Sequence, residues 1–291
     1  MDHGHDQRDR SLLGPRRASL SGALRRVPAL IGERKVQTMQ EERLIELLVR
    51  LHEGLPRLGP GNAESTRRAL ALCEHLPPAP DILDVGCGTG AQTLVLASET
   101  DGHIAATDLF PGFLAQLESS LQPRGLEGRV ETRTADMNDL PFPDESFDLI
   151  WSEGAVYIMG FDEALAKWRP LVRPGGYLVV SEASWFRSDP PAKLEEFWGD
   201  NYPTMRSVKE NLLAAQTLGW KPVGNFHLPV EAWTVDYYGP LKRRLPVFRE
   251  THAQDPDAQE VADMTEYEMD LLSSYSDFYG YEFYILRCVA P

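Results

Sequence analysis

The stretch that decides the fold is Asp81-Ile-Leu-Asp-Val-Gly-Cys-Gly-Thr-Gly90, in which three alternating glycines follow a short apolar run that contains one acid. An apolar strand that ends near Asp84 and turns on these glycines lets the backbone approach a ligand more closely than side chains permit. The helix expected next directs its unpaired N–H groups and positive dipole end at that ligand. The spacing G-x-G-x-G differs from the G-x-G-x-x-G of dinucleotide binders, in which the third glycine comes one residue later.

The glycine run resembles motif I of the class I methyltransferases that depend on S-adenosylmethionine (SAM), and the segments after it are similar to small-molecule methyltransferases of the ubiquinone/menaquinone-biosynthesis type. The resemblance covers residues 60–185 and, only in outline, the C-terminal third. It implies SAM as cofactor, S-adenosylhomocysteine (SAH) as product and no metal. The residues carried over from motif I as cofactor contacts are Asp84, Gly86, Cys87, Gly88, Thr89 and Gly90. The alternative is a glycine turn in another kind of α/β protein.

Beyond Pro80, short β-like runs alternate with helix-like runs, a pattern typical of a doubly wound parallel sheet. The resemblance implies an α/β fold with a seven-stranded, mostly parallel, Rossmann-like sheet whose last strand is antiparallel. Pro174 and the two glycines after it predict a tight turn before the fifth strand. The strands are expected near residues 81–85, 103–108, 129–134, 147–151, 177–182, 222–228 and 281–289.

The pattern along the chain predicts a core with two insertions. Residues 1–38 are interpreted as a disordered leader, with translation from Met39 as a second reading of the same segment. The expected parts that follow are N-terminal helices (39–80), a SAM-binding core (81–183), a cap insertion (184–206), a continuation of the core (207–230), a helical cap insertion (231–279) and the last strand (280–291).

Composition excludes several classes of function. The 291 residues carry a net charge of −15, and because residues 1–38 hold eight basic and four acidic residues, the remainder carries −19. So acidic a body would repel a phosphate backbone, which argues against nucleic-acid partners. Cys73, Cys87 and Cys288 form no C-x-x-C pair, so we expect neither disulfides nor a zinc site, and a cytoplasmic location. No apolar run approaches the roughly 20 residues of a membrane span.

Two strand ends are expected to bind the nucleoside part of the cofactor. Asp108 ends the second predicted strand, where a carboxylate can accept both ribose hydroxyls, and Leu109 would then lie against adenine. A helix N-cap at Asp108 is compatible with this role. Asp136 and Met137 resemble the acid-plus-apolar pair that reads adenine in the family, since the acid accepts from the amine while the thioether packs on the ring. A plain turn that begins at Asp136 is the alternative.

The loop after the fourth predicted strand is expected to face the methyl group. The resemblance carries Ser152 and Glu153 over as neighbours of the sulfonium. Glu153 is also a candidate general base, with orienting a cationic substrate or binding backbone N–H groups as alternatives. Tyr157 is the second catalytic candidate. The end of the fifth strand offers Glu182 and Trp185 as substrate contacts.

The two insertions are rich in aromatic residues and predict a cap over the sheet edge at which ligands bind. Trp233 and Tyr237 are taken from them as further substrate contacts, and ordinary core packing is the alternative for any single aromatic residue. The π faces of such a cap suit a planar or cationic acceptor. Other aromatic residues of the insertions include Phe186, Phe197, Trp198, Tyr202, Tyr238, Tyr267, Phe278 and Tyr279.

The sequence therefore predicts a SAM-dependent methyltransferase that moves a methyl group to a small-molecule N, O, S or C nucleophile by in-line displacement. No cluster with metal-ligand spacing and no Ser-His-Asp arrangement is present, so metal and covalent catalysis are not expected. The alternatives are a protein or RNA methyltransferase and a non-catalytic SAM or SAH sensor. The sequence leaves open the acceptor and the choice between monomer and homodimer.

Overall fold

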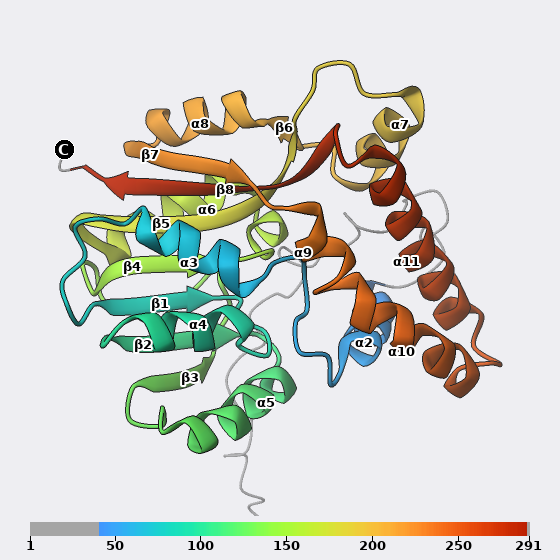
Figure 1. The fold of residues 1–291 in the computed structure, drawn as a ribbon, viewed down its shortest axis with the longest axis horizontal. Helices are drawn as coiled ribbons and strands as arrows, with labels where there is room; N and C mark the ends of the chain where they lie inside the picture. Colours follow the sequence, from blue (N-terminus) through green and yellow to red (C-terminus); the bar gives the residue numbers. More distant parts are fainter. Residues whose placement is uncertain (1–40, 290–291) are drawn as a thin grey trace, which may run out of the picture.

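The computed structural model describes residues 41–289, so the expected leader at 1–38 lies outside the described residues. Eight strands form one sheet in the order β3-β2-β1-β4-β5-β8-β7, with β6 paired to the end of β5 (Figure 1). The strands are β1 (Asp81–Val85), β2 (His103–Asp108), β3 (Val130–Thr134), β4 (Phe147–Ser152), β5 (Val172–Trp185), β6 (Arg206–Ser207), β7 (Trp220–His227) and β8 (Tyr279–Cys288).

The sheet confirms the predicted doubly wound, mostly parallel fold. Strands β1 to β5 run parallel, and β8 lies antiparallel between β5 and β7. The two-residue strand β6 makes an eighth strand that the sequence did not predict. The order of the strands reverses between β1 and β4, and such a switch point is where open α/β sheets bind ligands.

The start of β5 differs from the expectation. Pro174 and the two glycines after it lie inside β5 instead of forming a turn before it. The register between β4 and β5 shifts between Phe147 and Leu149, so an irregularity within the pairing absorbs these residues. The prediction of a separate turn was therefore wrong, because pairing with β4 begins as early as Val172.

Alternate residues of the strands enter two separate cores, one on each face of the sheet. In β1, Ile82 belongs to one core and Leu83 to the other, as the two-residue period of a strand requires. Helices α3 (Ala63–Ala71), α4 (Ala91–Glu99) and α5 (Pro111–Leu121) contribute to the first core, and α6 (Phe161–Trp168) and α8 (Val208–Thr217) to the second.

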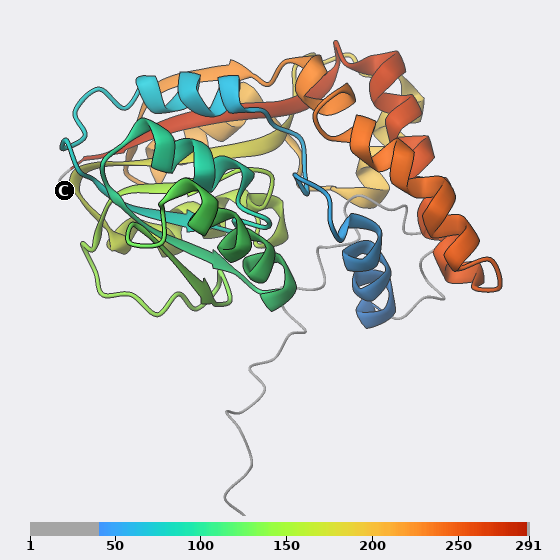
Figure 2. The same ribbon diagram turned by 60° about the horizontal axis from the view of Figure 1, so that its bottom comes forward.

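A group of helices lies beyond the carboxyl ends of the parallel strands (Figures 1 and 2). They are α2 (Glu41–His52), α7 (Ala192–Asn201), α9 (Val230–Thr234), α10 (Tyr238–Thr251) and α11 (Pro256–Tyr275). Helix α2 packs against α10 and α11, because Leu44, Leu47 and Leu51 recur at helical spacing and are all buried. The first helix of the described chain thus packs against the helices of the predicted aromatic cap.

No helix within residues 41–289 is long and apolar enough to cross a membrane.

Candidate functional site

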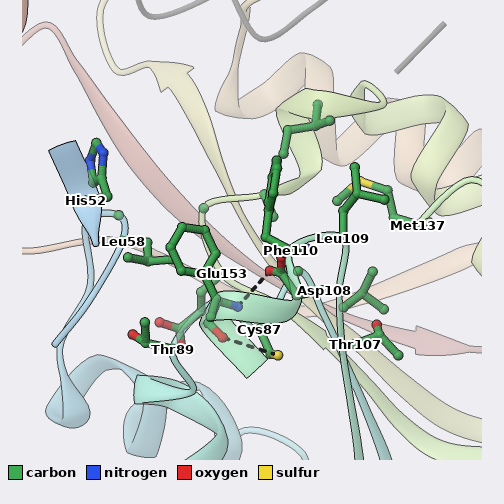
Figure 3. A pocket seen from close by; sticks show the side chains of 18 of the residues that line it. His52, Leu58, Cys87, Thr89, Thr107, Asp108, Leu109, Phe110, Met137 and Glu153 are labelled. Carbon is green, nitrogen blue, oxygen red and sulfur yellow. Dashed lines mark hydrogen bonds between the residues drawn. The ribbon is translucent and has the colours of Figure 1, made fainter. Parts of the chain in front are cut away.

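A cavity of about 240 Å³ lies at the switch point of the sheet, under the C-terminal half of α2. Figure 3 shows His52 and Leu58 on one side of this cavity and Leu109 and Met137 on the other. Most of the residues predicted to bind ligand line it, although they come from five separate segments. These residues are Gly86, Cys87, Gly88, Thr89, Asp108, Leu109, Asp136, Met137, Glu153, Tyr157 and Tyr237.

The loop after β1 turns its backbone toward the cavity at Gly88. This residue has φ +55°, and a Cβ atom added to it would lie 2.8 Å from Leu58 Cδ1. Its N–H donates a 2.9 Å hydrogen bond to Asp108 Oδ2, which ties the glycine loop to the end of β2. Neighbouring Thr89 donates to the Pro56 carbonyl at 3.2 Å. The loop is therefore held in place from both sides.

Three of the predicted cofactor residues do not line the cavity. Gly90 is the N-cap of α4, and a Cβ atom there would lie 2.3 Å from Leu117 Cδ1, so this glycine permits close packing of α5. Ser152 is fully buried and donates to the Val85 carbonyl at 2.9 Å. Asp84 is also fully buried, behind the glycine loop. All three residues therefore lie behind the wall of the cavity.

The Asp84 carboxyl organises the start of α4. It accepts hydrogen bonds from the Thr93 hydroxyl at 2.6 Å and from the Gln92 amide at 3.2 Å. Burial raises the pKa of Asp84 to about 7, although these two hydrogen bonds act in the opposite direction.

This shift predicts a pH dependence of stability. In an unfolded chain the pKa of aspartate is about 3.9, so between about pH 4 and 7 the folded protein binds a proton at Asp84 that the unfolded chain does not. Stability contributed by this group therefore falls as the pH rises, by up to about 1.4 kcal/mol per pH unit. We expect Asp84→Asn to flatten the plot of unfolding free energy against pH, as measured by urea denaturation. Identical slopes for the variant and the parent protein would contradict the shift.

The ends of β2 and β3 form the side of the cavity expected to bind the nucleoside. Asp108 is half-buried, and its two oxygens accept the backbone N–H groups of Gly88 and Phe110, each at 2.9 Å. The N-cap of α5 is Phe110 and not Asp108, so Asp108 precedes the helix by two residues more than an N-cap would. The oxygens keep lone pairs with which a carboxylate can accept further donors.

Asp136 and Met137, the pair predicted to bind adenine, both line the cavity. Asp136 Oδ1 accepts from both the backbone and the side-chain amide of Asn138, at 2.8 and 2.9 Å. The Asp139 N–H donates to the Asp136 carbonyl at 2.9 Å, so the turn given as the alternative is present. A turn and an adenine site are compatible here, because the hydrogen bonds of the turn use Oδ1 of Asp136 and not Oδ2.

Glu153 is buried in the cavity wall and binds three donors. Its Oε2 accepts from the Arg57 guanidinium at 2.9 Å. Its Oε1 accepts from the Thr66 hydroxyl at 2.7 Å and from the Trp151 indole at 3.0 Å. A general base needs a lone pair directed at the proton of the acceptor, whereas the protein itself engages both oxygens here. The donors are side chains and not the backbone N–H groups of the alternative prediction, and they indicate that Glu153 shapes the wall.

Two ring side chains close the cavity from opposite elements. His52 Nδ1 lies 2.8 Å from the Leu48 carbonyl, which can only accept, so Nδ1 carries the hydrogen. His52 Nε2 then accepts from the Tyr237 hydroxyl at 2.9 Å. Burial lowers the pKa of His52, which keeps the imidazole neutral. Because His52 ends α2 and Tyr237 precedes α10, this pair joins the first helix to the cap.

The sequence of the core matches a known family. Residues 83–180 match the family described as "Methyltransferase domain". The strand order, the glycine loop and the switch-point cavity all lie in or around this segment.

These residues form a class I methyltransferase domain.

Relatives and solved structures extend the match beyond this segment. A ubiquinone/menaquinone biosynthesis C-methyltransferase, UbiE of Psychromonas ingrahamii, is 32% identical over 139 residues, which cover 46% of this chain and 55% of that protein. An uncharacterized protein of Haemophilus influenzae is 27% identical over 173 residues, 58% of this chain and 66% of that protein. The chain spans less than two thirds of the length of the curated relatives it matches.

A solved SAM-dependent methyltransferase of Geobacter sulfurreducens, in complex with SAH, has the same fold. It superposes with a TM-score of 0.68 at 20% identity, covering 84% of this chain and 97% of that one. The fold similarity thus reaches past the methyltransferase domain into the elements that cap it.

Three predicted substrate contacts lie outside the cavity of the methyltransferase domain. Trp233 is buried against Tyr281, with ring centroids 4.8 Å apart, and Trp185 packs on Tyr279 at 6.3 Å. Both tryptophans therefore pack on residues of β8. Glu182 is also buried, and it accepts a hydrogen bond from the Tyr202 hydroxyl.

Other residues that line the cavity went unpredicted. They come from α2, from the segment after it and from the start of α5, and they are Ile45, Leu48, Val49, His52, Arg57, Leu58, Phe110 and Phe113. The one sequence signal that could have predicted the α2 residues is a second apolar stripe on this helix, beside the stripe that enters the core. Assigning this stripe to the cavity of the methyltransferase domain required knowing where the helix lies.

Proposed function

We propose that this protein is a SAM-dependent methyltransferase that acts on a small-molecule nucleophile. The observation that carries the proposal is one cavity that brings together the glycine loop, Asp108 and the Asp136–Met137 pair. These groups suit a ligand with a ribose, an adenine and a charged amino-acid tail.

The fit of SAM rests on the chemistry of each wall. Asp108 would accept the ribose hydroxyls, and Asp136 would accept the adenine amine while Leu109 and Met137 pack on the ring. The backbone around Gly88 would lie along the amino-acid part, where a side chain would collide with the facing segment.

The remaining walls of the cavity would orient the acceptor and exclude water from the reacting atoms. Bound SAM provides an electrophilic methyl group on a sulfonium, a leaving group that needs no nucleophile from the protein. Tyr157 and Tyr237 also line the cavity and would position the acceptor for in-line attack. Burial raises the pKa of Tyr157, with the charges of Glu268 and Glu182 acting in the same direction. Its hydroxyl therefore stays protonated and can donate a hydrogen bond.

Two features support a small acceptor over a macromolecule. Helix α2 and the His52–Tyr237 pair cover the cavity, whereas a protein or RNA substrate needs an open groove. The net charge of −15 also disfavours RNA. A non-catalytic sensor of SAM or SAH would share the same binding residues and differ only in turnover.

Calorimetric titration of the full chain with SAH and SAM tests the proposal. We expect both ligands to bind with dissociation constants in the micromolar range. Absence of heat with either ligand would reject the proposal. Binding of both, without methyl transfer from radiolabelled SAM to any member of a broad panel of small acceptors, would favour the sensor.

A further inference from the structure

One arginine in the cavity wall has donors that the protein does not use. Arg57 is the only lysine or arginine among the described residues that line the cavity, and its side chain is only 10% exposed. Its Nη1 donates to Glu153 at 2.9 Å, whereas Nη2 and Nε donate to no residue of 41–289. Buried donors are normally paired, so these two nitrogens point to an acceptor that a ligand supplies.

The segment around Arg57 lies over the glycine loop. The Thr89 hydroxyl donates to the carbonyl of the residue before Arg57 at 3.2 Å. On the other side of Arg57 in the chain, Leu58 faces Gly88 so closely that a Cβ atom at this glycine would meet it. Figure 3 shows Leu58 on the side of the cavity opposite to Leu109. Arg57 therefore lies beside the glycine loop and away from the wall expected to bind adenine.

The ion pair with Glu153 holds the guanidinium at the switch point of the sheet. Glu153 follows β4 directly and the glycine loop follows β1, so Arg57 lies where the strand order reverses. Gly61 leaves room for the pair, because a Cβ atom added there would lie 2.2 Å from Nη1 of Arg57 and 2.9 Å from Oε2 of Glu153. The Gly61 N–H also donates to the Ala232 carbonyl at 3.4 Å, which ties this segment to α9.

The glycine loop uses several of its own donors within the protein. The N–H groups of Cys87 and Gly90 donate to the Thr107 and Cys87 carbonyls, each at 2.9 Å. The Gly88 N–H donates to Asp108. The strongest donor left beside this loop is the guanidinium, whose planar fork matches the two oxygens of a carboxylate.

We propose that Arg57 binds the carboxylate of the methionine part of SAM through Nη2 and Nε, while Nη1 stays bonded to Glu153. This inference rests on the proposed methyltransferase function. Asp108 then holds the ribose and Arg57 the far end of the cofactor, so the sulfonium between them has a fixed place in the cavity. The ammonium and sulfonium of SAM together with the guanidinium balance the two carboxylates. The site thereby selects a cofactor that carries a carboxylate.

Two cofactors that differ only in the carboxylate test the inference. SAM and decarboxylated SAM share the nucleoside, the sulfonium and the amine, so a general loss of structure weakens the binding of both. Calorimetric titration of the full chain gives the ratio of their dissociation constants. We expect the parent protein to bind SAM about 10- to 100-fold more tightly than decarboxylated SAM, the effect of a hydrogen bond between charged groups.

Substitutions at Arg57 show whether this side chain sets the ratio. Arg57→Lys keeps a positive charge beside Glu153 but loses the planar fork, so the preference for SAM should fall. The double variant Arg57→Met, Glu153→Ala leaves no charge unpaired and should bind both ligands about equally. Arg67→Lys is the matched control, because Arg67 on α3 also pairs with a glutamate, Glu99, but is exposed and does not line the cavity. It should keep the preference of the parent protein.

The outcomes separate the two proposals. Failure of the parent protein to bind SAM would reject the methyltransferase function itself. Equal affinity of the parent protein for SAM and decarboxylated SAM would overturn the inference and assign the free nitrogens of Arg57 to another ligand, such as a carboxylate on the acceptor. A preference for SAM that both Arg57 variants retain would show that the carboxylate of the cofactor binds elsewhere.

Discussion

Glu153→Ala is expected to lower the free energy of unfolding by about 3 to 5 kcal/mol, the cost of removing one partner of a buried ion pair. The Glu153 and Arg57 side chains are only 1% and 10% exposed. The substitution leaves the guanidinium without a counter-charge, and it removes the acceptor of the Thr66 hydroxyl and the Trp151 indole. These losses act together because all three donors converge on one carboxylate.

Urea denaturation of a double-mutant cycle measures this coupling. The cycle compares Glu153→Ala, Arg57→Met and the double variant, in which no charge is left unpaired. We expect the double variant to be more stable than Glu153→Ala alone. A loss below about 1 kcal/mol for Glu153→Ala, the size typical of an exposed pair, would show that the segment with Arg57 does not hold this position in solution.

Asp108→Ala is expected to weaken SAH binding by about 1.5 to 3 kcal/mol for each ribose hydrogen bond that it removes. The carboxylate lines the cavity and also holds the N–H groups of Gly88 and Phe110, so part of the loss arises from a looser glycine loop. Calorimetric titration with SAH gives the change in affinity, and thermal unfolding shows whether the variant is folded.

Asp139→Ala is the matched control, because this acid is exposed in the turn that follows β3 and does not line the cavity. It should bind SAH like the parent protein. Unchanged affinity in a folded Asp108→Ala variant would reject the ribose role of Asp108.

Much of the sheet follows from local sequence. The stretch 81–90 predicts β1 and the glycine turn, since a short apolar run and closely spaced glycines act within a few residues. The predicted strands at 81–85 and 103–108 agree with β1 and β2 to the residue. The start of β5 was missed because pairing with β4, and not the local turn signal of Pro174, sets where that strand begins.

The cavity wall follows from sequence only in part. Asp108 was predicted from its position at a strand end, because parallel strands bring such ends to one edge, whereas Asp136 and Met137 were implied by the family resemblance. The partners of Glu153 were not predicted, since Arg57 precedes it by 96 residues and Thr66 by 87. Side chains so far apart carry no local signal of their contact.

The sequence by itself determined the sheet, the glycine loop and the acids at the strand ends, since each depends on residues close together in the chain. Only the tertiary structure decided which of these residues face the cavity, because exposure depends on what packs behind them. It turned Asp84, Gly90 and Ser152 away from the cavity. It also brought α2 and the cap together over the cavity, through contacts between segments that are remote in the chain.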